Sequence, residues 1–191
     1  MTKKTNKKRK KFILILNIII ISIVVIGLLG AGATFYIVKG IINDAPEIDP
    51  TRFAELWTEN AELLDVNGEL IEKLQTSGYR TIIKYDDMSP VLINSYISVE
   101  DKTFKEHSGF NYVRLVGAVW NSITSDSRIS GTSTITQQTA RNLYLPERMT
   151  ERTLDRKIKE AYYTVLMERR LNKEQILEAY LNTIYLGSGA Y

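Results

Sequence analysis

The sequence contains no cysteine, and among its 191 residues it has a single histidine, His107. The absence of cysteine excludes disulfide bonds, thiol catalysis and cysteine-based zinc sites. One imidazole cannot build a multi-histidine metal centre, and any serine–histidine nucleophile would depend on His107. The chemistry that remains rests on carboxylates, hydroxyls, amides and cations.

Acidic residues are missing from the N-terminal region. None occurs before Asp44, whereas seven basic residues fall within the first eleven positions. The rest of the chain holds 18 basic and 22 acidic residues, a net charge of −4, so the formal charge of +3 is a property of the tail. A strongly basic nucleic-acid binder is therefore excluded, and we expect no nucleic-acid partner.

Charge of either sign is missing between Phe12 and Val38, a run of 27 positions. A helix of that length covers about 40 Å, more than the apolar thickness of a bilayer. A cleaved signal peptide has a shorter apolar core, so we predict a basic tail over 1–11 and a transmembrane signal anchor over 12–38. The positive-inside rule places the tail in the cytoplasm and the residues from 39 onward outside the cell membrane.

The exported part changes pattern along its length. Residues 39–60 hold Pro46 and Pro50 among polar residues and predict a stalk. Asn67-Gly68 between apolar pairs predicts a β-hairpin over 63–71, and residues 79–85 favour a third strand.

Helical spacing follows from Pro90 onward. Cap residues and apolar periodicity predict five helices, which start at Pro90, cover 112–123, follow Gly131, cover 153–170 and start at Asn172. The fold class expected is mainly α, with one membrane helix and a small hairpin region. Since Gly187-Ser188-Gly189 is typical of the middle of a connection, we expect the helical domain over 61–191 to be incomplete at its C-terminus.

An acidic pair, Glu100 and Asp101, ends the helix that Pro90 opens. The negative end of the helix dipole disfavours a second negative charge, which suits a carboxylate that takes up a proton as a general base. By its spacing alone, the pair is more typical of two solvated carboxylates at a helix end than of a general base. His107 is explained equally well as a packing residue.

A hydroxyl-rich segment, residues 131–138, forms a second cluster. Thr134 and Gln137 satisfy a capping box and predict a helix N-terminus, where free N–H groups can bind phosphate. A capped helix without a ligand fits the same pattern. Four hydroxyls and two amides within seven residues exceed what capping needs and suit sugar or phosphate oxygens.

The helix predicted over 153–170 has two contrasting faces. At about 100° per residue, one side holds Leu154, Ile158, Ala161, Tyr162 and Val165, and the other holds Arg152, Arg156, Lys159 and Tyr163 beside Glu160. We predict that the first side packs in the core and the second points outward. The second is then either an ordinary solvated face or a clamp for a diphosphate next to a carboxylate.

Taken in order, these motifs resemble glycosyltransferase family 51, the peptidoglycan glycosyltransferase module of class A penicillin-binding proteins and monofunctional transglycosylases. The resemblance covers about residues 61–191 and is carried by Glu100-Asp101-x-x-Phe104-x-x-His107-x-Gly109, Gly131-x-Ser133-Thr134-Ile135-Thr136-Gln137-Gln138, Arg156-Lys157-x-x-Glu160 and Lys173-x-x-Ile176-Leu177-x-x-Tyr180-Leu181-Asn182. Thr132 departs from the second glycine that the family usually has. The resemblance implies a lysozyme-like helical glycosyltransferase domain.

It also implies an activity: polymerisation of lipid II into β-1,4 glycan strands, with inversion and release of undecaprenyl diphosphate. Glu100 would be the general base, and Glu160 a second catalytic carboxylate that holds the cations or a divalent ion. Binding roles would fall to Asp101, Phe104, His107, Ser133, Thr134, Gln137, Gln138, Arg141, Arg152, Arg156, Lys157 and Lys159.

The resemblance further implies help from Mg²⁺ or Mn²⁺ and no organic cofactor. The partners implied are lipid II, the growing lipid-linked glycan, the membrane and other cell-wall synthesis or divisome proteins.

Two other functions fit the same motifs. A lysozyme-like glycan hydrolase would use two carboxylates about the scissile bond and would degrade mature glycan without a diphosphate-linked donor. A non-catalytic membrane protein that binds lipid II or divisome partners would keep that binding after loss of Glu100.

Overall fold

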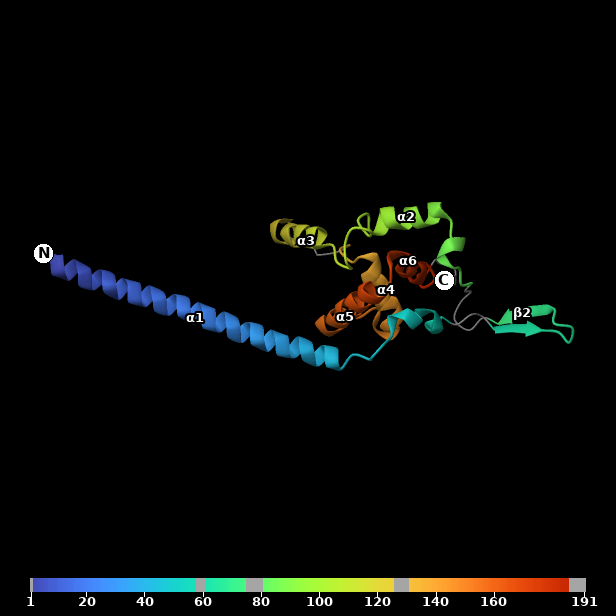
Figure 1. The fold of residues 1–191 in the computed structure, drawn as a ribbon, viewed down its shortest axis with the longest axis horizontal. Helices are drawn as coiled ribbons and strands as arrows, with labels where there is room; N and C mark the ends of the chain where they lie inside the picture. Colours follow the sequence, from blue (N-terminus) through green and yellow to red (C-terminus); the bar gives the residue numbers. More distant parts are fainter. Residues whose placement is uncertain (1, 58–60, 75–80, 126–130, 186–191) are drawn as a thin grey trace. The chain divides into compact units, whose positions relative to one another are not determined.

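The computed structural model describes residues 2–57, 61–74, 81–125 and 131–185 (Figure 1). The chain divides into two compact units, Met1–Pro46 and Glu47–Tyr191. The first unit is a single helix, α1 (Thr2–Asn43), within which Lys11–Asn43 is long and apolar enough to cross a membrane. The predicted anchor over 12–38 lies inside this stretch, and its apolar side chains are exposed.

The second unit is mainly helical, with one small sheet. Its elements are η1 (Pro50–Leu56), β1 (Ala61–Leu64), β2 (Leu70–Leu74), η2 (Tyr85–Asp87), α2 (Pro90–Glu100), α3 (Tyr112–Ser125), α4 (Ile135–Tyr144), η3 (Pro146–Arg148), α5 (Leu154–Arg170) and α6 (Lys173–Leu181). The predicted fold class is confirmed: mainly α, with one apolar N-terminal helix and a two-stranded antiparallel sheet.

The five predicted helices begin where their sequence signals stand. Pro90 is the first residue of α2. Thr134 and Gln137 exchange both capping-box hydrogen bonds at the start of α4, and Asn172 and Gln175 do so at the start of α6. These side chains satisfy N–H groups that a helix leaves unpaired at its N-terminus.

A third strand was predicted over 79–85, of which residues 79 and 80 lie outside the described ranges. For the described residues 81–85 the prediction is wrong, because they form no strand. The Ile83 N–H donates to Asn182 Oδ1 at 2.9 Å, and Asn182 Nδ2 donates to the Ile83 carbonyl at 2.8 Å. The Tyr85 N–H donates to Glu178 Oε2 at 2.9 Å. Side chains of α6 and its C-cap therefore take the backbone bonds that a neighbouring strand would have formed.

The core lies where α4, α5 and α6 pack together, around the inaccessible side chains of Ile135, Tyr163, Met167, Ile176 and Leu177. Segment η1 also packs on α5. Its Phe53 and the following Trp57 are buried, with their rings 5.1 Å apart in a T-shaped arrangement. Part of the segment predicted as a stalk is therefore built into the helical unit.

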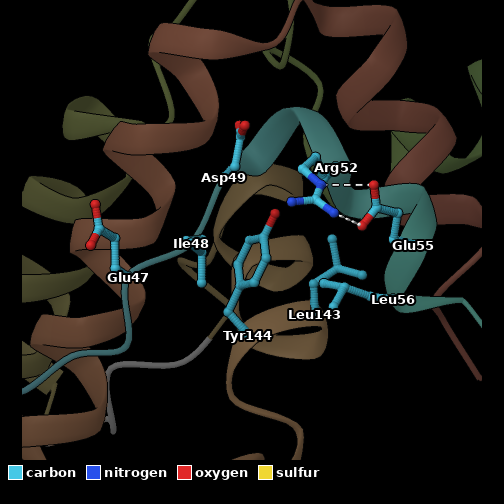
Figure 2. Close-up of a pocket in the computed structure, with 8 residues that line it drawn as sticks. All are labelled: Glu47, Ile48, Asp49, Arg52, Glu55, Leu56, Leu143 and Tyr144. Atoms are coloured by element: carbon cyan, nitrogen blue, oxygen red, sulfur yellow. Dashed lines mark hydrogen bonds and ion pairs between the residues drawn. The ribbon is translucent and has the colours of Figure 1, made fainter.

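Figure 2 shows a pocket of about 410 Å³ between the η1 segment and the end of α4. Its apolar side is formed by Ile48, Leu56, Leu143 and the ring of Tyr144. The Tyr144 hydroxyl is buried and has no hydrogen-bond partner. Burial, followed by the nearby charge of Asp49, raises the pKa of Tyr144 to about 12.

We expect Tyr144→Phe to leave stability at neutral pH unchanged or to raise it, because an unpaired buried hydroxyl costs about 1–3 kcal/mol. The raised pKa means that the neutral phenol is favoured in the folded state. The stability that this preference for the neutral phenol contributes is fully present below a pH of about 10, and it is lost as the pH rises toward about 12. Thermal unfolding from pH 7 to 12 should show a smaller alkaline loss in the variant. A large loss of stability at pH 7 would contradict the unpaired assignment.

Candidate active site

Glu100 is the last residue of α2, is half-buried and is held from two directions. The Arg114 guanidinium of α3 donates to the Glu100 carbonyl at 2.8 Å. Gln138 Nε2 of α4 donates to Glu100 Oε2 at 2.9 Å. Glu100 also lines two open pockets, one beside Tyr96 and one beside Arg114.

Asp101 points in a different direction from its neighbour and is 1% exposed. Its Oδ2 accepts from the Ile135 N–H at 3.2 Å and contacts His107 Nε2 at 2.9 Å. The Gly109 N–H donates to His107 Nδ1 at 3.2 Å, so Nε2 carries the proton that is donated to Asp101. This pair fastens the loop after α2 to the first residue of α4.

Phe104 is inaccessible to solvent, and Lys173 Nζ lies 4.4 Å from the centre of its ring. The same ammonium group donates to the His107 carbonyl at 2.7 Å and to Glu168 at 2.8 Å. Gly109 has φ of 90°, and a Cβ there would lie 2.7 Å from Thr164 Cγ2. Phe104, His107 and Gly109 of the first motif thus pack against α5 and Lys173 of α6.

The polar residues at the start of α4 divide into two groups. Thr134 and Gln137 are buried and form the capping box, and Thr134 Oγ1 also donates to the Gly109 carbonyl at 2.7 Å. Ser133 and Gln138 are half-buried. Ser133 Oγ accepts from Lys157 Nζ at 3.4 Å, whereas Gln138 reaches Glu100. The start of α4 and the loop before it therefore join the Glu100 motif to the Lys157 motif.

Glu160 is fully buried between two cations. It accepts from Arg156 Nη1 at 2.5 Å and from Lys157 Nζ. The Nε atoms of Arg156 and Arg141 are buried without a hydrogen-bond partner, and such donors favour an incoming anion. The two remaining predicted cations differ from each other. Lys159 is buried, and its Nζ lies 3.6 Å from Asp155 Oδ2, whereas Arg152 is exposed.

The predicted orientation of α5 is wrong. Its buried residues are Arg156, Lys159, Glu160, Tyr163, Thr164 and Met167, whereas Leu154 is exposed and Ile158, Ala161, Tyr162 and Val165 are half-exposed. The buried cations of this side, Arg156 and Lys159, turn inward because Glu160 and Asp155 pair with them within the fold, and because Tyr163 and Met167 on that side supply apolar contacts. A rule that places charge outside fails where charges are paired.

The prediction for Glu160 is that it holds either the cations or a divalent ion. Both of its carboxylate oxygens already accept from cations. Within the described ranges, no group of three histidine, cysteine, aspartate or glutamate side chains could hold a metal ion. The described residues therefore do not fit a metal site built by the protein.

The sequence interpretation missed Arg114, which lies beside Glu100. Asn111 Oδ1 accepts from the Arg114 N–H at 2.8 Å and starts α3 at that point. Around the rest of α3, Val113, Val116, Trp120 and Ile123 are exposed, the last at 75%. Arg114 is the one charged residue of α3, and that was the signal that could have identified it.

Comparison with known proteins gives one family. The sequence model of a family described as "Transglycosylase" matches residues 67–191. Penicillin-binding protein 1A of Clostridium tetani is 34% identical over 189 residues, which are 97% of this chain and 23% of that relative. Penicillin-binding protein 2D of Bacillus subtilis is 46% identical over 105 residues, 55% of this chain and 15% of the relative. Penicillin-binding protein 1A of Aquifex aeolicus is 36% identical over 171 residues, 87% and 23% respectively. The chain thus spans less than a quarter of the length of these relatives.

Proposed function

This chain belongs to the transglycosylase family, glycosyltransferase family 51, and from that membership we propose that it acts as a peptidoglycan glycosyltransferase. In this proposal it polymerises lipid II into β-1,4 glycan and releases undecaprenyl diphosphate. One observation carries most of the weight. Gln138 of α4 contacts Glu100, and Ser133, in the loop just before the N-cap of α4, contacts Lys157, so a base and a group of cations adjoin the same helix N-terminus.

The proposed reaction uses these two groups in one displacement. Glu100 takes the proton of the acceptor 4-hydroxyl, and the oxygen forms a bond to the anomeric carbon of the donor. The bond from that carbon to the diphosphate oxygen breaks, and the electron pair leaves with the diphosphate, so an α-linked donor gives a β-linked product. Arg141, Arg156, Lys157 and Lys159 would stabilise the charge that develops on the leaving group.

The exposed apolar side of α3 supports a substrate held in a membrane. Its exposed side chains include Val113, Val116 and Trp120, which are the kind that lie at a bilayer interface. Because Arg114 of the same helix contacts Glu100, a bilayer that met this face would lie close to the proposed base. We propose that the helical unit works at the outer face of the cell membrane, with the basic tail in the cytoplasm.

No step of this reaction is assigned to a metal ion, because the described residues do not fit a site for one. We propose that any Mg²⁺ or Mn²⁺ is held by the diphosphate of the substrate. The proposed partners are the lipid-linked glycan and other cell-wall synthesis proteins of the divisome.

The test is a polymerisation assay in proteoliposomes with labelled lipid II. The expected products are glycan strands and undecaprenyl diphosphate. In a parallel reaction with mature glycan and no lipid diphosphate, we expect no shortening of the strands. Shortened strands would indicate a hydrolase, and binding of lipid II without any product would indicate a binding protein. Either result would overturn the proposal.

A further inference from the structure

We infer that Gln138 is a positioning residue for Glu100: its amide holds one carboxylate oxygen, so that the other oxygen faces the acceptor hydroxyl. The inference rests on the proposed function, because it assigns a role within that reaction. The family resemblance implies that Gln138 contacts the substrate. The inference gives it a different role, that of positioning Glu100.

The geometry fixes both ends of Glu100. An ionised carboxylate only accepts hydrogen bonds, so the 2.9 Å contact is a bond that Gln138 Nε2 donates to Oε2. Arg114 fixes the main chain of the same residue through its carbonyl. Across the ranges that the structure describes, no hydrogen bond reaches Glu100 Oε1. One oxygen is therefore held, and the other is free to take a proton.

Helix α4 gives Gln138 a fixed base. Each of the four residues before it is committed to an internal contact: Thr134 to the capping box, Ile135 to Asp101, Thr136 to Glu168 at 2.6 Å and Gln137 to Thr134. Two neighbouring glutamines therefore differ in what they do. The Gln137 amide closes the start of the helix, and the Gln138 amide reaches across to α2.

Positioning and substrate contact predict different kinetics. A general base works only within hydrogen-bond reach of the proton that it removes, and a misplacement of about 1 Å can cost about 10²-fold in rate. Loss of a positioning contact should therefore lower kcat. Loss of a sugar contact should instead weaken binding and raise KM.

The first experiment compares Gln138→Met, which keeps the size of the side chain but removes the donor, with the wild-type protein in proteoliposomes and with lipid II as substrate. We expect kcat to fall about 10- to 100-fold and KM to stay within about 2-fold. The matched control is Gln175→Met, which removes an exposed capping amide at the start of α6 and should leave kcat unchanged. If the methionine variant fails to fold, Gln138→Ala should give the same split between kcat and KM.

The second experiment does not depend on turnover. The dissociation constant of lipid II is measured for Glu100→Gln and for Glu100→Gln combined with Gln138→Met. Equal values support positioning. A clear weakening in the double variant would assign Gln138 to the substrate site, and an unchanged kcat in the single Gln138 variant would remove the positioning role. Either result would overturn the inference alone. A wild-type protein that makes no glycan would overturn the proposed function, and the inference with it.

Discussion

Glu100→Gln is expected to lower kcat for glycan polymerisation by about 10²- to 10⁴-fold, the range that a general base contributes. The substitution keeps the size of the side chain but removes the group that accepts the proton. Initial rates with lipid II in proteoliposomes would measure the loss.

Folding should be preserved in this variant for two structural reasons. The Gln138 amide can still donate to the new amide oxygen, and the Arg114 bond goes to the main chain, which does not change. Thermal unfolding should therefore match the wild type. A variant that polymerises at the wild-type rate would remove Glu100 from the mechanism, and a variant that fails to fold would give it a structural role instead.

Local signals made most of the helices predictable. Thr134 with Gln137, and Asn172 with Gln175, satisfy their own helix ends within three residues, so the sequence alone carries that information. The hairpin turn is equally local, because the Asp65 carboxylate accepts the N–H groups of Asn67 and Glu69 at 2.8 and 2.7 Å.

Predictions failed where the deciding partner lies far along the chain. The backbone of Ile83 is paired by Asn182, which is 99 positions away, so a local sequence that favours a strand gave the wrong element. The predicted orientation of α5 was wrong because Glu160 pairs with Arg156 and Asp155 pairs with Lys159 within the fold, and periodicity carries no information about pairing. Gln138 and Arg114 were not recognised as contacts of Glu100 because both bonds join different helices.

The second large effect is expected for Asp101→Ala, which should lower the free energy of unfolding by about 2–6 kcal/mol. Asp101 lies at 1% exposure and accepts from His107 and from the Ile135 N–H. Its removal leaves two donors unpaired in a place that water does not reach, and each such donor costs about 1–3 kcal/mol. Denaturant unfolding of the protein in detergent would measure the change.

Two further variants separate this burial effect from simple loss of an aspartate. Asp101→Asn keeps an acceptor for the Ile135 N–H, so it should lose less stability than the alanine variant. Asp65→Ala removes a carboxylate that accepts two backbone N–H bonds in an exposed turn. Because water can replace this carboxylate, the loss of stability should be smaller still. Equal losses at positions 65 and 101 would show that burial does not set the cost. Of the two adjacent carboxylates at the end of α2, Glu100 lines a pocket, whereas Asp101 is buried and accepts hydrogen bonds within the fold, so only the loss of Asp101 is expected to lower stability in this way.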